Sequence, residues 1–304
     1  MLNKSQINLL LSLRKSGYTW EEISKQFKGE TPNALRKTYY RTIRKPLAKI
    51  LLLDIETKPL IAHVWGLWEN NVGLEQVQED WSILSWSAKW LHDPDDVITY
   101  RDNRNNKDLE DDKKLLEDLW KMLDEADIVI AHNGDAFDIP KLYARFIKHG
   151  FKRPSSFKTI DTKKIAARVF KFSSNKLVYL ADYLGVKYQK LSHAKFPGHI
   201  MWKECMKGNK DAWKEMEAYN RRDVLTLQEV YYKLRPWDSS INFNVYHDDE
   251  GHVCSCGSVD FKEHKTYHYT KTGKFRKYIC VECGAESKGK DNLLSKEKRK
   301  HMRS

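Results

Sequence analysis

The sequence has no apolar run that approaches the length of a membrane span, about 20 residues. Its first residues lack the cationic and apolar segments of a secretory signal peptide. Cysteine is scarce, with five in 304 residues. We therefore expect a cytoplasmic protein with no membrane partner. Disorder of the whole chain is excluded as well, because 40% of the residues are hydrophobic and 12% are aromatic.

Positive charge is in excess, with a formal net charge of +12, and it is unevenly distributed. Residues 1–45 contain ten Lys or Arg against three Asp or Glu, and residues 251–304 contain thirteen against six. Each end therefore carries +7, and the rest of the chain carries −2. Basic ends around a slightly acidic centre are expected when the ends bind a polyanion and the centre binds metal ions.

Residues 1–45 have the pattern of three short helices. Spaced apolar residues predict a first helix that ends near Gly17, and Thr19 has the position of an N-cap for a second. Thr31-Pro32 predicts the start of a third, basic helix. This arrangement indicates a small all-α helix-turn-helix module, with a protein-docking module as the alternative. Four cationic residues of the third helix would face nucleic acid: Arg36, Lys37, Arg41 and Arg44.

A buried strand is predicted over residues 50–57, where a branched apolar run ends in an acidic pattern. Because strand side chains alternate, Asp54 and Glu56 project from one face and Ile55 turns into the core. Two neighbouring carboxylates at the end of a buried strand need a cationic partner, and Mg²⁺ or Mn²⁺ prefers such ligands. If the Asp54-x-Glu56 pattern is considered alone, an acidic solvent-exposed loop is the alternative interpretation.

The chain from about 48 to 237 predicts a mixed α/β domain. The expected strands cover 61–68, 81–90, 96–100 and 127–131, and the main helices cover 107–123 and 211–234. The strand over 127–131 leads into an Asn-Gly turn, which places Asp138 at a helix start beside the carboxyl end of a strand. Asp161 is predicted to be a helix N-cap. On the last helix, Tyr219 and Asp223 are one turn apart and share a face.

Three short motifs follow one another in this domain: Asp54-x-Glu56, Asn133-x-x-x-Phe137-Asp138 and Tyr219-x-x-x-Asp223. With them, residues 48–237 resemble the DEDD exonucleases, which are ribonuclease H-like, DnaQ-type 3′–5′ exonucleases. Ala218 stands where the histidine subtype has its histidine, so the tyrosine subtype (DEDDy) matches. The domain looks most like the stand-alone exonucleases of phages and bacteria that are related to polymerase proofreading domains. The resemblance implies a ribonuclease H-like mixed sheet flanked by helices.

The resemblance also implies hydrolysis of DNA phosphodiester bonds by two Mg²⁺ or Mn²⁺ ions. Tyr219 would orient the attacking water, and Asn133 and Phe137 would help to place the terminal nucleotide. A separate DNA polymerase or a replication or repair protein is an expected partner, in a bacterial or phage-infected cell. The implied metal ligands are Asp54, Glu56, Asp138 and Asp223.

A zinc ribbon is predicted over residues 251–287. Two cysteine pairs, each followed by glycine, flank a predicted hairpin around 270–274, and in a cytosolic protein such pairs favour zinc over disulfides. The first pair is one residue shorter than the usual C-x-x-C, which leaves His252 as an alternative ligand. Residues 288–304 are expected to form a basic flexible tail. One structural Zn²⁺ would be held by Cys254, Cys256, Cys280 and Cys283.

Several functions stay open at this stage. The leading hypothesis is a metal-dependent 3′–5′ exonuclease whose flanking modules bind DNA. An endonuclease or an exoribonuclease on the same fold is an alternative, because the acidic cluster does not distinguish ribose from deoxyribose. A transposase-like enzyme would use three acids without the paired Asp-x-Glu. A DNA-binding regulator with an inactive nuclease domain would bind nucleic acid without hydrolysing it.

Overall fold

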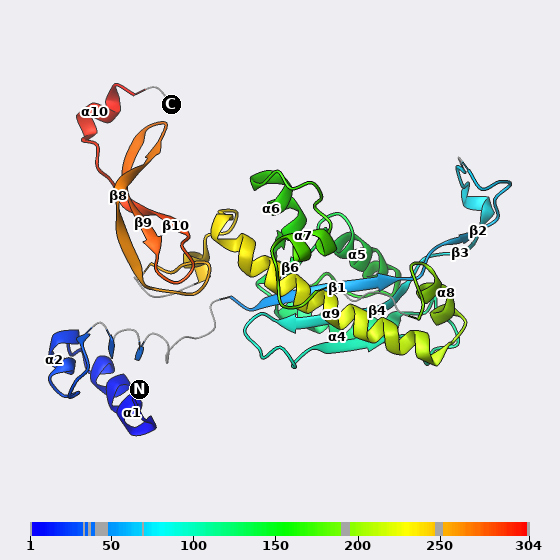
Figure 1. Ribbon diagram of the computed structural model, residues 1–304, viewed down its shortest axis with the longest axis horizontal. Helices are drawn as coiled ribbons and strands as arrows, with labels where there is room; N and C mark the ends of the chain where they lie inside the picture. Colours follow the sequence, from blue (N-terminus) through cyan, green and yellow to red (C-terminus); the bar gives the residue numbers. More distant parts are fainter. Residues whose placement is uncertain are drawn as a thin grey trace. The chain divides into compact units, whose positions relative to one another are not determined.

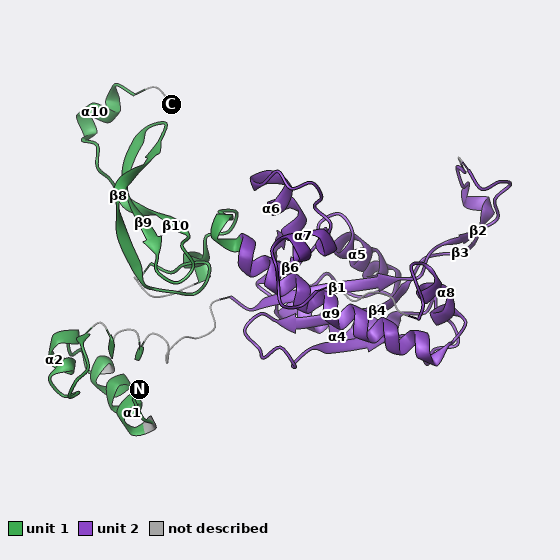
Figure 2. Ribbon diagram, in the orientation of Figure 1, with its two compact units in different colours: residues 1–47, 235–304 green, residues 48–234 purple. Residues whose placement is uncertain are grey.

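The computed structural model describes residues 2–32, 34–35, 38–39, 48–68, 70–189, 195–246 and 252–302. Residues 48–234 form one compact unit, and residues 1–47 and 235–304 are grouped in a second (Figure 2). Within the described residues, no helix combines the length and hydropathy that crossing a membrane requires. The four cationic residues predicted to face nucleic acid lie outside the described residues: Arg36, Lys37, Arg41 and Arg44.

A five-stranded sheet forms the centre of residues 48–234 (Figure 1). Its order is β5-β4-β1-β6-β7, and β1 pairs antiparallel with β4 and parallel with β6. This mixed sheet with flanking helices confirms the predicted fold class and places β1 in the middle. The strands are β1 (Ile50–Thr57), β4 (Ile83–Trp90), β5 (Thr99–Asp102), β6 (Ile128–Ala131) and β7 (Lys158–Asp161).

Different helices cover the two faces of β1. Leu51, Leu53 and Ile55 belong to an apolar core shared with α4 (Lys113–Glu125) and α5 (Asp138–Lys148). The opposite face, which carries Asp54 and Glu56, lies under the long helix α9 (Lys210–Leu234). Burial on both faces explains why β1 begins as an unbroken apolar run.

Three shorter helices pack against α9. They are α6 (Thr162–Val169), α7 (Leu177–Tyr183) and α8 (Ile200–Met206). Met201 and Cys205 of α8 share an apolar cluster with Trp213 and Tyr219 of α9. This cluster fixes the part of α9 that carries the predicted Tyr219 motif.

The segment after β1 differs from its prediction. A strand over 61–68 is wrong for all but two residues, because only β2 (Ile61–Ala62) and β3 (Val77–Glu79) pair there, with a short 3₁₀ helix η1 (Leu74–Gln76) before β3. Figure 1 shows this hairpin projecting away from the sheet. Its apolar residues therefore have no second layer to pack against, and Trp65 and Trp68 are 101% and 86% exposed.

The N-terminal residues form a small helical core of their own. The first two predicted helices are confirmed as α1 (Lys4–Lys15) and α2 (Trp20–Ser24), and Thr19 caps α2 as expected. The Thr31 hydroxyl accepts the N–H of Ala34 at 3.2 Å, as an N-cap does. Four buried side chains form the core: Leu10, Ile23, Phe27 and Leu35.

After α9 the chain contains the 3₁₀ helices η2 (Arg235–Trp237) and η3 (Phe243–Tyr246) and a three-stranded antiparallel sheet of order β10-β9-β8. Its strands are β8 (Phe261–Thr270), β9 (Gly273–Cys280) and β10 (Glu286–Asn292), so the predicted hairpin is confirmed. The predicted tail from residue 288 overlaps with the sheet, because β10 pairs with β9 as far as Asn292, and α10 (Lys296–Lys300) follows. The sequence of β10 lacks the alternation of apolar and polar residues that predicts a strand, and the strand forms through backbone pairing with β9.

Candidate active site

The carboxylates of Asp54, Glu56 and Asp223 converge. One oxygen from each lies within 4.8 Å of the others. β1 supplies the first two, and α9, which packs across β1, brings the third from far along the chain. Three like charges at this separation repel one another unless a cation joins them. Hard divalent cations such as Mg²⁺ and Mn²⁺ prefer oxygen ligands of this kind, so the donor set fits such a metal.

Asp138 reaches the same strand from α5, the helix on the opposite face of the sheet. Its Oδ1 accepts the backbone N–H of Ile55 at 3.2 Å, between the two acidic residues of β1. It is not a member of the converging group of three. The pKa of Asp138 is raised to about 7, chiefly by burial, with a smaller contribution from the Asp161 carboxylate, while the hydrogen bond from the Ile55 N–H opposes the shift. A nearby cation would favour its ionised form.

Tyr219 lies one helical turn before Asp223 and is buried, with the ring of Trp202 packed edge-on at a centroid distance of 6.0 Å. Burial raises the pKa of its phenol, and the carboxylates of Asp223, Glu56 and Asp54 raise it further. Tyr219 therefore stays protonated at neutral pH. It can donate a hydrogen bond in this site, but it cannot act as a base.

Asn220 is a site residue that the sequence patterns did not reveal. Its side-chain Nδ2 donates to Oδ2 of Asp54 at 2.5 Å and to the Asp54 carbonyl at 3.3 Å, and the residue is completely buried. The amide therefore fixes the orientation of one predicted metal ligand. In the sequence, the sign of this role was that Asn220 directly follows Tyr219 in the predicted helix.

The turn before Asp138 is held in an unusual backbone conformation. Asn133 has φ of 70°, and Oδ1 of Asp161 accepts its N–H at 2.9 Å. The same oxygen accepts the N–H of Lys163 at 3.0 Å at the start of α6, which confirms Asp161 as an N-cap. A Cβ on Gly134 would lie 2.4 Å from the Cβ of Ala131, so this position requires glycine. The Asp161 carboxylate thus joins the turn at Asn133 to the start of α6.

Phe137, the residue before Asp138, is half-buried against the core between β1, α4 and α5. The Lys141 ammonium lies 5.2 Å from its ring centroid and 3.7 Å from that of Trp81. Asn133 and Phe137 therefore flank the turn that leads into Asp138. Their predicted contact with a terminal nucleotide stays a prediction.

A second group of potential metal ligands lies beside the C-terminal sheet. The Sγ atoms of Cys254, Cys256, Cys280 and Cys283 all lie within 4.8 Å of one another. Hydrogen bonding to Cys256 is the main reason that the pKa of Cys254 falls to about 4, which makes it a thiolate at neutral pH. Four sulfur ligands at this spacing fit a tetrahedral zinc site.

The two cysteine pairs sit in equivalent turns despite their different spacing. The N–H of Cys254 donates to the carbonyl of Ser258, and that of Cys280 to the carbonyl of Ala285, both at 2.9 Å. The glycine after each pair has a positive φ, 82° and 75°. The first turn is thus one residue shorter but closes in the same way. His252 is outside the cysteine group, and its Nε2 hydrogen bonds to Ser287.

Comparisons with known proteins bear on the larger unit. A family model described as the RNase_H superfamily matches residues 51–235. The solved structure of the family B DNA polymerase from the hyperthermophilic archaeon Pyrobaculum calidifontis is similar with 15% sequence identity and a TM-score of 0.43. That match covers 63% of this chain but 26% of the polymerase, so the chain spans about a quarter of its length. No curated protein sequence matches the chain.

Proposed function

The chain belongs to the ribonuclease H superfamily, and on this basis we propose that it is a metal-dependent 3′–5′ exonuclease that degrades DNA. The observation that carries the proposal is the convergence of Asp54, Glu56 and Asp223 at the end of the central strand. Tyr219, one turn before Asp223 on the same helix, supports assignment to the tyrosine subtype of the DEDD exonucleases.

The metal ligands in this proposal are four carboxylates. Asp54, Glu56, Asp138 and Asp223 would hold two Mg²⁺ or Mn²⁺ ions. Bound about 4 Å apart, such a pair stabilises charge on the attacking and leaving oxygens of a phosphodiester and activates water. Asp138 reaches β1 from α5 and would complete the ligand set that the group of three begins.

Other residues orient the reactants. Asn220 holds the Asp54 carboxylate in one rotamer through its 2.5 Å hydrogen bond. The protonated Tyr219 donates a hydrogen bond to the attacking water or to a phosphate oxygen. Asn133 and Phe137 would contact the terminal nucleotide beside Asp138. No side chain has to act as a nucleophile.

The flanking modules complete the proposal. Residues 1–45 would bind DNA as a helix-turn-helix, with Arg36, Lys37, Arg41 and Arg44 on the nucleic-acid side. The four cysteines would hold one structural Zn²⁺ in a ribbon that extends to Asn292, the end of β10. A separate polymerase or a replication or repair protein would be a partner of the whole chain.

The direction of degradation and the preference for DNA or RNA can be tested with DNA and RNA strands labelled at the 3′ or the 5′ end. We expect Mg²⁺-dependent shortening of DNA in single steps from the 3′ end, absent in Asp54→Ala and present in Asp118→Ala. Asp118 is a suitable control because it is an exposed acid, paired with Arg101 outside the site. Internal cuts would identify an endonuclease, and preferred shortening of RNA an exoribonuclease. Binding without any cleavage would identify a regulator with an inactive nuclease domain.

A further inference from the structure

One face of the C-terminal sheet carries aromatic rings that the proposed metal sites do not use. Tyr267 and Tyr269 alternate along β8 and therefore project from the same face. Their ring centroids lie 6.4 Å apart, and they are 40% and 66% exposed. The two rings meet edge to face, with 70° between their planes, and each is open to solvent.

Cationic side chains stand opposite these rings on the neighbouring strand. Lys274 pairs with Tyr269 and Arg276 pairs with Tyr267 in the β8–β9 register, so all four share one face. The Lys274 ammonium lies 3.9 Å from the ring centroid of Tyr267. Arg276 also forms an ion pair with Glu263. Rings and positive charges therefore alternate across the two strands.

The same face continues onto β10 without obstruction. Tyr278 follows Arg276 on this face and pairs with Ser287 of β10. A Cβ built on Gly289 would lie 3.3 Å from the ring of Tyr278 and 3.4 Å from the Cβ of Arg276. Glycine at this position therefore leaves room for the Tyr278 ring, and it lies where the β9–β10 pairing becomes irregular, as strand glycines often do.

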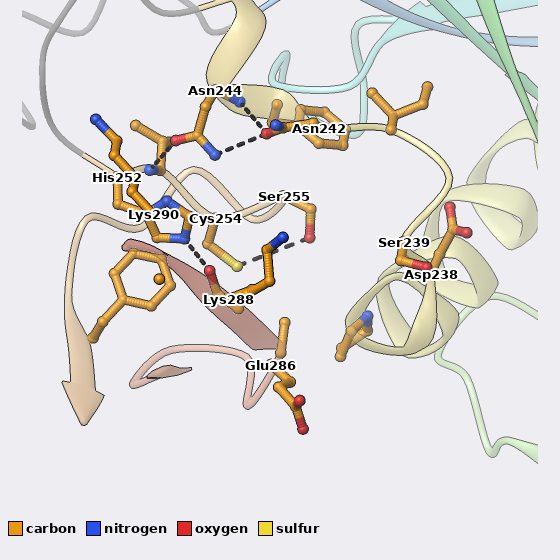
Figure 3. Close-up of a pocket in the computed structure, with 18 residues that line it drawn as sticks. Asp238, Ser239, Asn242, Asn244, His252, Cys254, Ser255, Glu286, Lys288 and Lys290 are labelled. Atoms are coloured by element: carbon orange, nitrogen blue, oxygen red, sulfur yellow. Dashed lines mark hydrogen bonds between the residues drawn. The ribbon is translucent and has the colours of Figure 1, made fainter. Parts of the chain in front are cut away.

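Beyond Ser287 and Gly289 the face meets an open cavity of about 660 Å³, lined by β10, the first cysteine turn and the segment 236–244 (Figure 3). This volume is within the range of small-molecule sites, about 300–1,000 Å³. Its lining combines two aromatic rings, Phe243 and Phe261, with amide, hydroxyl and cationic groups and two carboxylates, Asp238 and Glu286. The labelled polar and cationic residues include Asn244, Ser255, Lys288 and Lys290.

We propose that this face and its cavity bind a single nucleic-acid strand. Bases would stack on Tyr267 and Tyr269, Lys274 on the same face would contact phosphates, and the cavity would receive one unstacked nucleotide. The net charge of +7 over residues 251–304 complements a polyanion. Stacking requires exposed base faces, which a duplex does not offer, so the aromatic pair selects single strands. The inference rests on the proposed function only in that the chain acts on nucleic acid.

Fluorescence anisotropy with 5′-fluorescein oligothymidylate tests this inference. The full chain carries Asp54→Asn in every sample, so that the strand stays intact, and no chelator is added, so that zinc stays bound. We expect Tyr267→Ala/Tyr269→Ala to bind the strand at least about tenfold more weakly, because stacking on aromatic side chains carries much of such binding. The matched control, Tyr267→Phe/Tyr269→Phe, keeps both rings and should bind within about twofold of the parent.

Zinc content and circular dichroism of both variants verify that the sheet is intact. Unchanged strand affinity in the alanine variant would overturn the proposal. So would equal losses on single strands and on blunt duplex. A dimer in sedimentation that the alanine substitutions dissociate, with strand affinity unchanged, would identify the face as a contact between copies and also overturn it. Because the assay measures binding and not cleavage, its result can be interpreted even if the protein is not an exonuclease.

Discussion

Asp138 differs from the other proposed metal ligands because it is almost completely buried and its pKa is raised to about 7. The folded protein therefore binds this proton more tightly than the unfolded chain, whose Asp has a pKa near 3.8. Without metal, ionisation of Asp138 lowers the free energy of unfolding as the pH rises from about 4 to about 7, and the full penalty persists above that range.

Substitution of Asp138 by Asn should remove this penalty. We expect metal-free Asp138→Asn to be more stable than the wild type by roughly 2–4 kcal/mol at about pH 8, with no gain near pH 4. Urea unfolding at the two pH values measures the difference. Added Mn²⁺ should stabilise the wild type more than the variant. An equal difference at both pH values would contradict the assignment of the raised pKa.

Asn220 should act through Asp54 and not through substrate. We expect Asn220→Ala to weaken metal binding by roughly 10–100-fold, as loss of a ligand-orienting hydrogen bond does. Cleavage rates measured over a range of Mn²⁺ concentrations should recover in part at high concentration. Asn71→Ala, an exposed position, is the control and should leave the metal dependence unchanged. A lower rate with unchanged metal dependence would argue against this role.

The sequence predicted site residues where chemistry imposes a pattern on neighbouring positions. Asp54 and Glu56 alternate on a strand, and Tyr219 and Asp223 are one helical turn apart, so the sequence alone predicts which side chains share a face. The contact of Asn220 with Asp54 depends on how α9 crosses β1, which no local pattern encodes.

At the level of elements, a buried ion pair fixes helix α5, which begins with Asp138. The Arg145 guanidinium binds both oxygens of the buried Asp112, and Asp112 also accepts the N–H of Ile83 at the start of β4. Arg145 further donates to the Trp81 carbonyl at 3.3 Å. The network ties α5 to the strand beside β1, so the position of Asp138 depends on it.

We expect Arg145→Met to lower the free energy of unfolding by about 3–5 kcal/mol, because the buried Asp112 carboxylate loses its guanidinium and keeps the imidazole of His149 beside it. Arg101→Met removes an exposed pair with Asp118 and should cost less than about 1 kcal/mol. Urea unfolding measures both. Similar small losses in the two variants would show that the buried pair does not hold the helix.

Strands and helices with their own periodic pattern were predictable, and those built by pairing alone were not. The run over 50–57 becomes β1 because its residues are buried on both faces. β10 has the sequence Glu-Ser-Lys-Gly-Lys-Asp-Asn and forms because β9 offers an edge. Conversely, residues 63–68 have the apolar content of a strand, but among the described residues they pair with no strand and belong to the hairpin that projects from the sheet.

For the whole molecule, the cysteine group should make the C-terminal sheet dependent on metal while residues 48–234 are independent of it. We expect one zinc per chain in the wild type and in Cys205→Ser, since Cys205 is outside the group, and none in Cys280→Ser. Elemental analysis measures the zinc, and limited proteolysis should cut Cys280→Ser within 252–302 first. Retention of zinc in Cys280→Ser would contradict four-cysteine ligation.

Hydrolysis at the carboxylate site can be tested by measuring the rate of single-stranded DNA cleavage as a function of Mg²⁺ or Mn²⁺ concentration. Wild type, Asp223→Asn and the surface control Asp118→Asn are compared under the same conditions. The structure predicts saturable metal dependence in the wild type and the control, and loss of nearly all cleavage in Asp223→Asn. Cleavage that survives in Asp223→Asn, or that proceeds equally without divalent metal, would contradict the account.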